Sequence, residues 1–388
     1  MKKTNYFFAG IVLIMLIIHP LVLISQSSPK KYNVLFISTH DMNFRVNFLG
    51  HEGPSLPNLN RLVERGMVFY NNYCQYPFCS PSRTSLLTGW RPDRTGVFND
   101  NVRPRSLLGP DVKFLPEYFS LNGYYTERYG IVTQGKYSND ITTWNYAEPP
   151  ESEEKTTAKG TTAKEEGGTW WIDNKADTAK NNAPWALHLA ERMTQPVTEP
   201  FFYALGFNET HNPFTPNLSN WNINGDPNVT QSLPDKEEDL RYTGNGSGNI
   251  LLPNTPPGDR DDVPPIAFNI DAIAKTDSEW RNTKHAYYGD VSQMDTYVGW
   301  VLDKMDEQNL WDNTIVVFWV DHGQHLGEHE GTWLKLTLFE ESNRIPFIIC
   351  VPGKKPGVCY RVTENVDLYA TLAELCGLPA PPEMEGSS

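Results

Sequence analysis

The chain has 388 residues, of which 39% are hydrophobic and 12% aromatic, so it can bury one large core or two smaller ones and global disorder is excluded. It carries 33 basic and 47 acidic side chains, a formal net charge of −14, which excludes the broad electropositive face that nucleic acids require. An anionic substrate would have to be attracted by a local pocket or a metal.

The first segment, residues 1–27, has the pattern of an export signal. Two lysines precede an apolar run from Phe7 to Ile24, and a polar stretch follows it. His19 and Pro20 interrupt the run, which favours a cleaved signal peptide over a membrane anchor. We therefore expect export (secreted, periplasmic or lysosomal), with no stable membrane span after cleavage and a folded domain over residues 28–388.

Three short apolar runs end at polar side chains, as buried parallel strands end at the carboxyl edge of a sheet. The runs and the polar residues after them are Asn33–Thr39 with His40 and Asp41, Phe201–Phe207 with Asn208 and His211, and Ile315–Val320 with Asp321 and His322. Open α/β sheets bind their ligands at this edge. We therefore expect the site to be built there.

Helical patterns lie between these runs. One covers Pro57–Arg65 and is closed by Gly66, and a longer one has apolar residues at three-and-four spacing between Val291 and Met305. Alternation of strands and helices predicts an α/β fold with a mostly parallel central sheet and helices on both faces.

Two stretches do not fit this core. Residues 148–168 are charged, lack large apolar side chains and repeat the sequence TTAK, so they predict a mobile insertion. Residues 208–265 are rich in Asn, Pro, Gly and Asp, which predicts long loops on the ligand side of the sheet.

The most informative stretch is Cys79–Arg83, CSPSR, followed by TSLLTG. Pro81 within the first turn and Gly89 after the apolar pair predict a helix that begins at Cys79. The positive end of the helix dipole favours an anion or an oxyanion beside that residue. The alternative is a disulfide or a buried thiol that happens to precede PSR.

An exported chain meets oxidising conditions, so its five cysteines are candidates for disulfides. The number is odd, so one cysteine is special, unpaired or matched outside the chain. If Cys79 is set aside, the others could form two bridges in any of three ways. The four are Cys74, Cys350, Cys359 and Cys376.

The C-x-P-S-R motif followed by T-G resembles the signature of type I sulfatases, which belong to the alkaline phosphatase superfamily. The resemblance extends from about Asn33 to Ser388, and the order of elements is most similar to iduronate-2-sulfatase-like members. It implies a sulfatase catalytic domain over residues 28–388 that hydrolyses sulfated sugars or glycosaminoglycan-like glycans. It also implies one bound Ca²⁺ and a formylglycine made from Cys79 by a formylglycine-generating or anaerobic sulfatase-maturating enzyme.

The resemblance implies roles for individual residues. The implied metal ligands are Asp41, Cys79, Asp321 and His322, with His40 as a further candidate, and the implied catalytic residues are Cys79, Arg83, Lys136, His211 and Lys335. One hydroxyl of the hydrated aldehyde would attack sulfur with the help of the metal, and the second would later expel sulfate. Arg83, Lys136 and Lys335 would neutralise the sulfate oxygens, and His211 or a neighbour would protonate the departing alcohol.

The sequence departs from the family pattern at several points. His40 stands where the family has an aspartate, and imidazole is a poor ligand for Ca²⁺. Asn139 and Asn208 replace side chains that usually handle protons. The sequence also stops at Ser388, where relatives continue into a small C-terminal subdomain, so we expect this subdomain to be missing or truncated.

Two alternatives to an active sulfatase stay open. The first is a catalytically impaired relative that binds sulfated glycans without cleaving them. The second is a phosphoester or phosphonate hydrolase of the same superfamily. His325, Glu328 and His329 also have the spacing of metal ligands, but we interpret them as structural, because a zinc-type site needs a complete tetrahedral set with other ligands nearby.

Overall fold

The computed structural model describes residues 31–134, 137, 140–148, 170, 172, 176–179, 182–228, 247–268, 276–379, 381 and 383–388. Residues 31–388 form one compact unit. The predicted export signal, Lys136, Asn139 and all of the predicted insertion except Glu148 lie outside the described residues. None of the described helices has both the length and the apolar character that crossing a bilayer requires.

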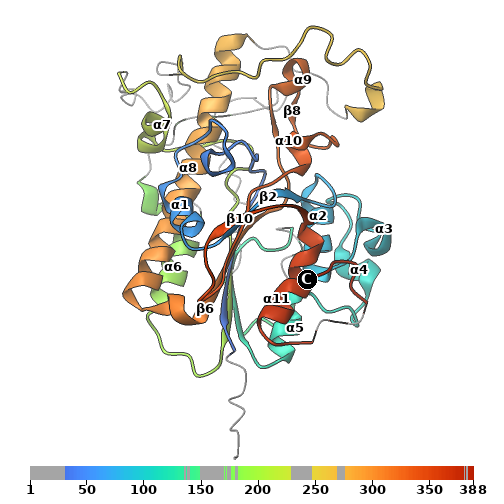
Figure 1. Cartoon of the computed structure of the whole chain (residues 1–388), viewed down its shortest axis with the longest axis vertical. Helices are drawn as coiled ribbons and strands as arrows, with labels where there is room; N and C mark the ends of the chain where they lie inside the picture. Colours follow the sequence, from blue (N-terminus) through green and yellow to red (C-terminus); the bar gives the residue numbers. More distant parts are fainter. Residues whose placement is uncertain are drawn as a thin grey trace, which may run out of the picture. The chain divides into compact units, whose positions relative to one another are not determined.

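An eight-stranded sheet runs through this unit and is parallel except at one strand (Figure 1). Its strands in spatial order are β10 (Gly357–Glu364), β2 (Met67–Tyr73), β9 (Phe347–Cys350), β6 (Thr314–Val320), β1 (Asn33–Thr39), β5 (Phe201–Gly206), β3 (Tyr125–Gly130) and β4 (Tyr146–Ala147). Strand β9 is antiparallel to both of its neighbours. A separate hairpin pairs β7 (His325–Leu326) with β8 (Trp333–Leu334).

Helices cover both faces of the sheet. The helices of the described residues are α1 (Pro57–Val63), α2 (Cys79–Thr88), α3 (Pro92–Thr95), α4 (Pro104–Leu108), α5 (Leu115–Leu121), α6 (Ala183–Arg192), α7 (Leu218–Asn224), α8 (Asp277–Glu307), the short turn α9 (Glu328–Gly331), α10 (Glu340–Asn343) and α11 (Leu368–Leu375). Helices α1, α6 and α8 lie on one face, and α2, α5 and α11 lie on the other (Figure 1).

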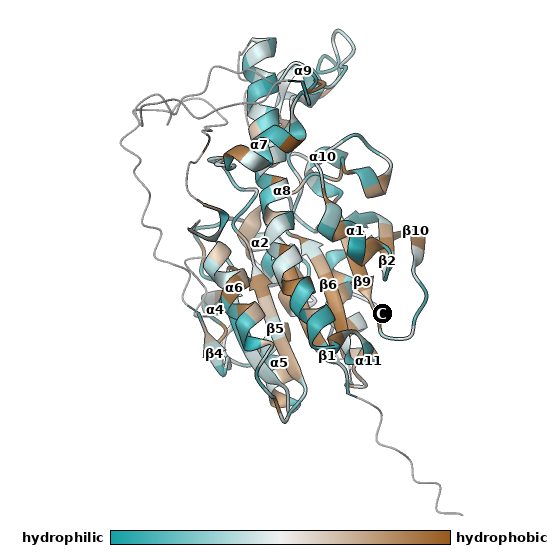
Figure 2. Cartoon of the chain, turned by 90° about the vertical axis from the view of Figure 1, so that its left-hand side faces the viewer, coloured by the Kyte–Doolittle hydropathy of each residue, from teal (hydrophilic) through white to brown (hydrophobic). Residues whose placement is uncertain are grey.

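Alternation along the strands separates two cores. Leu35 and Ile37 of β1 pack towards α8, whereas Val34 and Phe36 pack towards α2 and α5. Because β1 and its neighbours β5 and β6 are buried on both faces, their sequences are almost continuously apolar, as the brown strands of Figure 2 show. The predicted fold class, a mostly parallel sheet with helices on both faces, is confirmed.

The cysteines are arranged differently from the expectation. All five are free thiols, so the four disulfide candidates form no bridge with one another in the structure. They lie on separate elements: Cys74 follows β2, Cys350 ends β9, Cys359 lies within β10 and Cys376 follows α11. Cys350, for example, is buried and donates to a backbone carbonyl of α1 rather than to another sulfur.

Candidate active site

The register of the central strands brings two distant acidic residues together. Strands β1 and β6 are parallel, with Thr39 opposite Val320, so the residues that follow them leave the sheet side by side. Asp41 adopts a left-handed backbone conformation (φ 47°), and its amide donates to Asp321 Oδ1 over 3.0 Å. The two predicted carboxylates therefore meet at the carboxyl edge of the sheet, as the sequence indicated.

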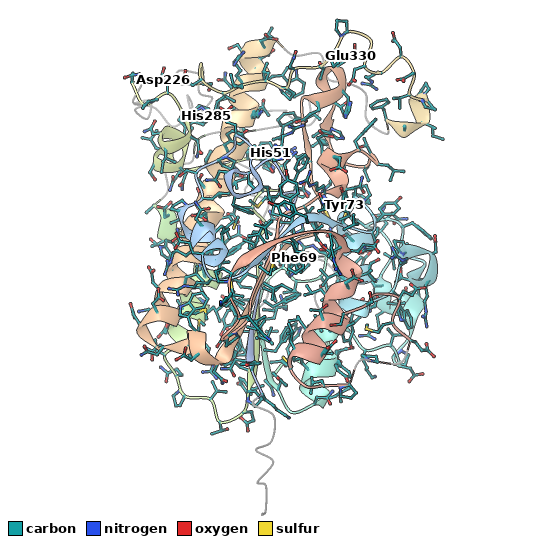
Figure 3. All side chains as sticks on the ribbon, in the orientation of Figure 1. His51, Phe69, Tyr73, Asp226, His285 and Glu330 are labelled. Carbon is teal, nitrogen blue, oxygen red and sulfur yellow. The ribbon has the colours of Figure 1, made fainter. Side chains whose placement is uncertain are left out.

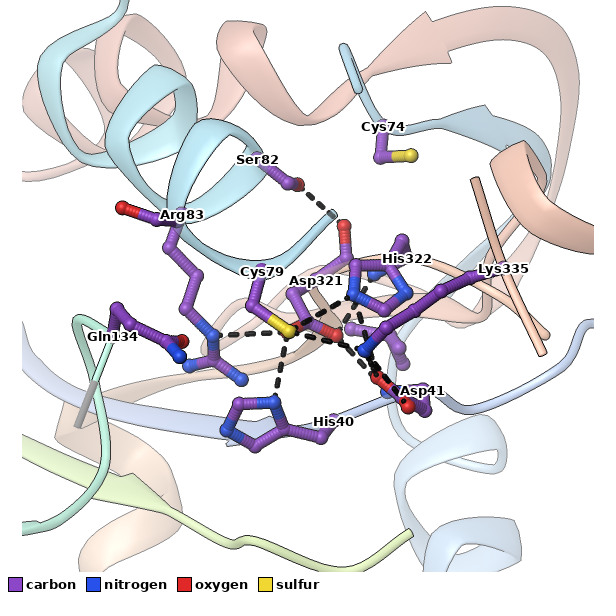
Figure 4. A network of polar contacts seen from close by, with 12 residues as sticks. His40, Asp41, Cys74, Cys79, Ser82, Arg83, Gln134, Asp321, His322 and Lys335 are labelled. Atoms are coloured by element: carbon purple, nitrogen blue, oxygen red, sulfur yellow. Dashed lines mark hydrogen bonds and ion pairs between the residues drawn. The ribbon is translucent and has the colours of Figure 1, made fainter. Parts of the chain in front are cut away.

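Helix α2 places Cys79 against this pair. The helix begins at Cys79, after Phe78 in extended conformation, and ends at Gly89, whose φ of 70° closes it in the left-handed region. Pro81 fits the first turn because amide donors there have no partner within the helix. Cys79 is 1% exposed, and its Sγ lies 3.3 Å from His322 Nε2 (Figure 4).

Lys335 joins the site from the segment that follows β8. Its Nζ lies 2.9 and 3.0 Å from the two carboxylate oxygens of Asp41 and 3.2 Å from Cys79 Sγ. Cys79 and Lys335, which are more than 250 positions apart in the sequence, are thus in direct contact. We call His40, Asp41, Cys79, Asp321, His322 and Lys335 the Cys79 cluster (Figure 4).

Asp321 is held by the Arg83 guanidinium and the His40 ring, which both contact one of its carboxylate oxygens. Arg83 Nε donates to Asp321 Oδ2 over 3.0 Å, and His40 Nδ1 lies 3.0 Å from the same oxygen. Arg83 is fully buried, and its terminal nitrogens donate to the backbone carbonyls of Thr39, Ile131 and Val132. In this arrangement Arg83 orients Asp321 and α2, a position that favours action through the carboxylate over direct contact with a substrate.

Burial and charge set the protonation states of the cluster. Burial raises the pKa of Cys79 well above the ordinary thiol value, so the sulfur stays neutral at physiological pH. Burial disfavours the charged form of Lys335, but the negative charge of Asp41 outweighs it and holds the pKa of the lysine above its usual value. Desolvation opposes ionisation of Asp321, but His322 and Arg83 hold its pKa well below the ordinary range.

His211 also comes to this edge, because β5 is the parallel neighbour of β1. Thr210 donates through its amide and its hydroxyl to the His40 carbonyl, which fixes the chain beside the site. The His211 ring is half-buried and lies edge-on to the His40 ring, with 5.7 Å between centroids. Asn208, in the same segment, is exposed, and its backbone amide donates to Asn182.

The side chains present fit a divalent cation. One ligand atom each from His40, Asp41, Cys79 and Asp321 lies within 4.8 Å of the others, and all four residues are buried. His40 Nε2 is buried without a hydrogen-bond partner among the described residues. The two carboxylates suit Ca²⁺, which prefers oxygen ligands. With the imidazole, the same set also suits Mn²⁺ or Zn²⁺.

Sequence reasoning missed one contact at the start of α2. Asp100 Oδ1 accepts a hydrogen bond from the Ser80 amide over 2.8 Å, and so satisfies a donor of the first turn. Nothing in the sequence around Asp100 indicates this partner. Cavity size does not indicate the site either, because a cavity of about 520 Å³ is lined by Asn33 and Phe201 at the opposite, amino-terminal edge of the sheet.

The sulfatase family model matches residues 32–378. The chain belongs to the sulfatase family. This confirms the resemblance drawn from the CSPSR motif. The predicted enzyme class, a sulfuric ester hydrolase, is confirmed too, because the similar curated proteins are named sulfatases.

Individual comparisons agree with this assignment. Iduronate 2-sulfatase of Mus musculus is 30% identical over 406 residues, which cover 92% of this chain and 71% of that protein. A phosphonate monoester hydrolase of Agrobacterium radiobacter has a similar fold, with a TM-score of 0.70, 19% identity and coverage of 92% of this sulfatase chain and 76% of that one. A structure solved with its substrate D-glucosamine-2-N,6-O-disulfate gives a TM-score of 0.64, 18% identity and coverage of 92% and 79%.

Proposed function

We propose that this sulfatase hydrolyses sulfate esters of sugars or glycans, with a formylglycine made from Cys79 as its nucleophile and a divalent cation bound beside it. One observation carries the proposal. The Cys79 sulfur lies at the start of α2, 3.2 Å from the Lys335 ammonium and 3.3 Å from His322, within a buried group of metal-ligand side chains. A cysteine that only fills the core would have no reason to sit among these charges.

The unmodified thiol is poorly suited to the reaction. The nucleophilic form of cysteine is the thiolate, and burial raises the pKa of Cys79 so far that little thiolate forms. A formylglycine at this position supplies, as its hydrate, one hydroxyl that can attack sulfur and a second that can release sulfate. A divalent cation held by Asp41, Asp321 and His322 or His40 would lower the pKa of such a hydroxyl.

Lys335 is the cation best placed to receive the sulfate group. Its ammonium stays charged, because the Asp41 charge outweighs the effect of burial on its pKa. It also contacts the sulfur atom of Cys79 directly, so it would face the oxygens of a sulfate bound there as negative charge redistributes. Arg83 would contribute by holding Asp321, and Lys136 stays a predicted sulfate contact.

His211 has a hydrogen bond that leaves one nitrogen for proton transfer. Its Nδ1 lies 2.7 Å from the Asn212 carbonyl, which can only accept, so Nδ1 carries a hydrogen. The Nε2 atom can then hold the proton that the departing alcohol needs. The edge-on contact with the His40 ring keeps His211 beside the cluster.

The substrate class is inferred from relatives. The similar protein from Mus musculus is an iduronate 2-sulfatase, and one similar structure contains a disulfated glucosamine. The first is a sulfatase by name and the second binds a sulfated sugar as its substrate. Both support a sulfated sugar or a glycosaminoglycan-like glycan as the substrate of this chain. Because loops determine specificity on such folds, the particular sugar does not follow from the fold.

Mass spectrometry of one tryptic peptide tests the proposal. Residues 66–83 form a single peptide that contains both Cys74 and Cys79. After coexpression with a maturating enzyme and alkylation of thiols, we expect one alkylated cysteine, Cys74, and the loss of sulfur and two hydrogens with gain of oxygen at Cys79. Cys74 is an internal control, because it is buried in the same region but lies outside the cluster. Alkylation of both residues would contradict the proposal.

A second candidate function is the binding of sulfated glycans without cleavage, and His40 favours it. An imidazole in place of a carboxylate gives the cation one oxygen ligand fewer, which weakens a Ca²⁺ site. Turnover of an aryl sulfate by the formylglycine form separates the two candidates. Glycan binding by that form without turnover would establish the second, and turnover of an aryl phosphate instead would indicate a phosphoester hydrolase.

A further inference from the structure

A second group of histidine and acidic side chains lies on the segment that follows His322. His325, His329 and Glu341 each offer one ligand atom, and the three atoms lie within 4.8 Å of one another. His325 is fully buried and Glu341 is 6% exposed, whereas the His329 side chain is 21% exposed. We call these three residues the His325 cluster; Glu330, labelled in Figure 3, marks the turn that carries His329.

Each ligand is held from behind by another side chain. His325 Nε2 lies 2.6 Å from the Thr337 hydroxyl, and His329 Nδ1 lies 2.7 Å from Asp259 Oδ2. Glu341 Oε1 accepts from Arg45 over 2.8 Å. Metal-binding histidines in proteins are oriented in this way, with the outer nitrogen bonded to a hydroxyl, carbonyl or carboxylate and the inner nitrogen free.

The inner nitrogens have no hydrogen-bond partner among the residues that the structure describes. His329 Nε2 makes no hydrogen bond although Glu341 Oε2 lies 3.4 Å away, and His325 Nδ1 makes none either. Since Asp259 can only accept, His329 Nδ1 carries a hydrogen, and a neutral ring directs the Nε2 lone pair towards the Glu341 carboxylate. Two electron-rich atoms at this distance repel each other unless a proton or a metal ion lies between them.

A buried histidine outside both clusters shows the contrast. His285 lies on α8 (Figure 3), and its Nε2 donates to the Trp221 carbonyl over 2.8 Å while its Nδ1 lies 2.9 Å from the Ser247 hydroxyl. Both ring nitrogens of His285 are thus satisfied without a metal, as is usual for buried polar groups. The free nitrogens of His325 and His329 depart from this rule and converge on the same carboxylate.

We propose that the His325 cluster binds a divalent transition metal of the Zn²⁺ type, bound by His325 Nδ1, His329 Nε2 and Glu341 Oε2. Imidazole and carboxylate are the ligands that Zn²⁺ takes in proteins, and bonds of about 2.0–2.1 Å place tetrahedral ligand atoms about 3.3 Å apart. The 3.4 Å between His329 Nε2 and Glu341 Oε2 already matches this spacing. Water or Glu328, whose Oε2 is 4.0 Å from His325 Nδ1, can complete the set.

The site would tie together the segment that carries Lys335. His325 begins the β7–β8 hairpin, Glu341 lies in α10, and Lys335 lies between them in the sequence. A metal bound to both ends would restrict the positions open to Lys335, which contacts Asp41 and Cys79. The inference does not depend on the formylglycine chemistry, because none of its ligands belongs to the Cys79 cluster.

Zinc titration of the full chain tests the site. Metal-free protein is titrated with Zn²⁺ in excess Ca²⁺, which competes poorly for imidazole nitrogen, and the experiment is repeated with Co²⁺ to record its visible spectrum. We expect wild type to bind Zn²⁺ and to give the intense absorption of tetrahedral Co²⁺. His329→Ala should bind Zn²⁺ at this site at least about 100-fold more weakly, and Asp259→Asn about 10–100-fold more weakly, through loss of the orienting carboxylate.

His188→Ala is the matched control. His188 is also a histidine paired with a carboxylate, Glu148, over 2.7 Å, but it is exposed and belongs to neither cluster, so its loss should leave Zn²⁺ binding unchanged. Asp259 is partly exposed, and its conservative substitution keeps the chain folded, as thermal unfolding would verify. Equal Zn²⁺ affinity and stoichiometry in wild type, His329→Ala and Asp259→Asn would overturn the inference in favour of a protonated His329 between two carboxylates.

Discussion

The Cys79 cluster and the His325 cluster both contain histidines and carboxylates but balance their charges differently. In the Cys79 cluster each carboxylate has its own permanent cation, since Asp41 pairs with Lys335 and Asp321 with Arg83. In the His325 cluster Arg45 holds one oxygen of Glu341, and the other faces a histidine nitrogen without a hydrogen bond. The first arrangement places the fixed positive charge of Lys335 beside the candidate cation ligands, whereas the second has, among the described residues, only histidine nitrogens beside the free oxygen of Glu341.

Removal of the proposed nucleophile is expected to have the largest effect on activity and to leave metal binding at the His325 cluster intact. Cys79→Ala should lower kcat on an aryl sulfate by on the order of 10⁴-fold or more, because a nucleophile cannot be replaced by its neighbours. Zn²⁺ binding at the His325 cluster should stay the same. Cys350→Ala, which removes another buried thiol, is the control and should retain activity. Full activity in Cys79→Ala would exclude Cys79 as the source of the nucleophile.

Neutralising one carboxylate in each cluster should lower the stability of the protein by different amounts. Asp321→Asn leaves the buried Arg83 without its charge partner and should cost about 3–5 kcal/mol in the free energy of unfolding. Glu341→Gln should cost less than about 1 kcal/mol, because the Arg45 side chain is 34% exposed and still pairs with Glu328. Urea denaturation of both variants measures the two free energies of unfolding. Equal decreases would show that the buried Arg83 does not need the charge of Asp321.

Sequence patterns predicted the parts of the site that local chemistry determines. The strand runs before His40 and Asp321 and the helix start at Cys79 depend on apolar runs, Pro81 and Gly89, and the structure has them close to the predicted bounds. The antiparallel direction of β9 could not be predicted, because a four-residue apolar run carries no signal of direction. The partners of His329 could not be predicted either, since Asp259 and Glu341 lie in segments without a recognisable motif.

His285 gives a reference for the buried histidines of both clusters, and its pH dependence can be measured. Burial lowers the pKa of His285 from 6.5 to about 4, so between these values the unfolded chain binds a proton that the folded chain does not. Stability is therefore fully present above pH 6.5 and falls as the pH decreases towards 4, by at most about 3 kcal/mol from this residue. The decline measured by urea denaturation should be shallower in His285→Gln than in wild type, and identical slopes would show that His285 is protonated in the folded state.

His40 is a nitrogen donor beside the carboxylates of the Cys79 cluster, which would otherwise offer oxygen ligands to a metal. Its replacement is expected to have the smallest effect, a change in Ca²⁺ affinity. His40→Asp adds a carboxylate beside Asp321, and we expect about tenfold tighter Ca²⁺ binding, because Ca²⁺ affinity rises with the number of charged oxygen ligands. The aryl-sulfatase rate at limiting Ca²⁺ should rise with the occupancy of the site. His40→Asn, which adds a neutral oxygen, should give a smaller gain in Ca²⁺ affinity, so the two variants separate ligand charge from ligand size in calorimetric titrations.

Zn²⁺ affinity at the His325 cluster should not change in either variant. Unchanged Ca²⁺ affinity in His40→Asp would mean that the cation does not bind between Asp41 and Asp321, and the charge balance of the Cys79 cluster would then serve anion binding alone.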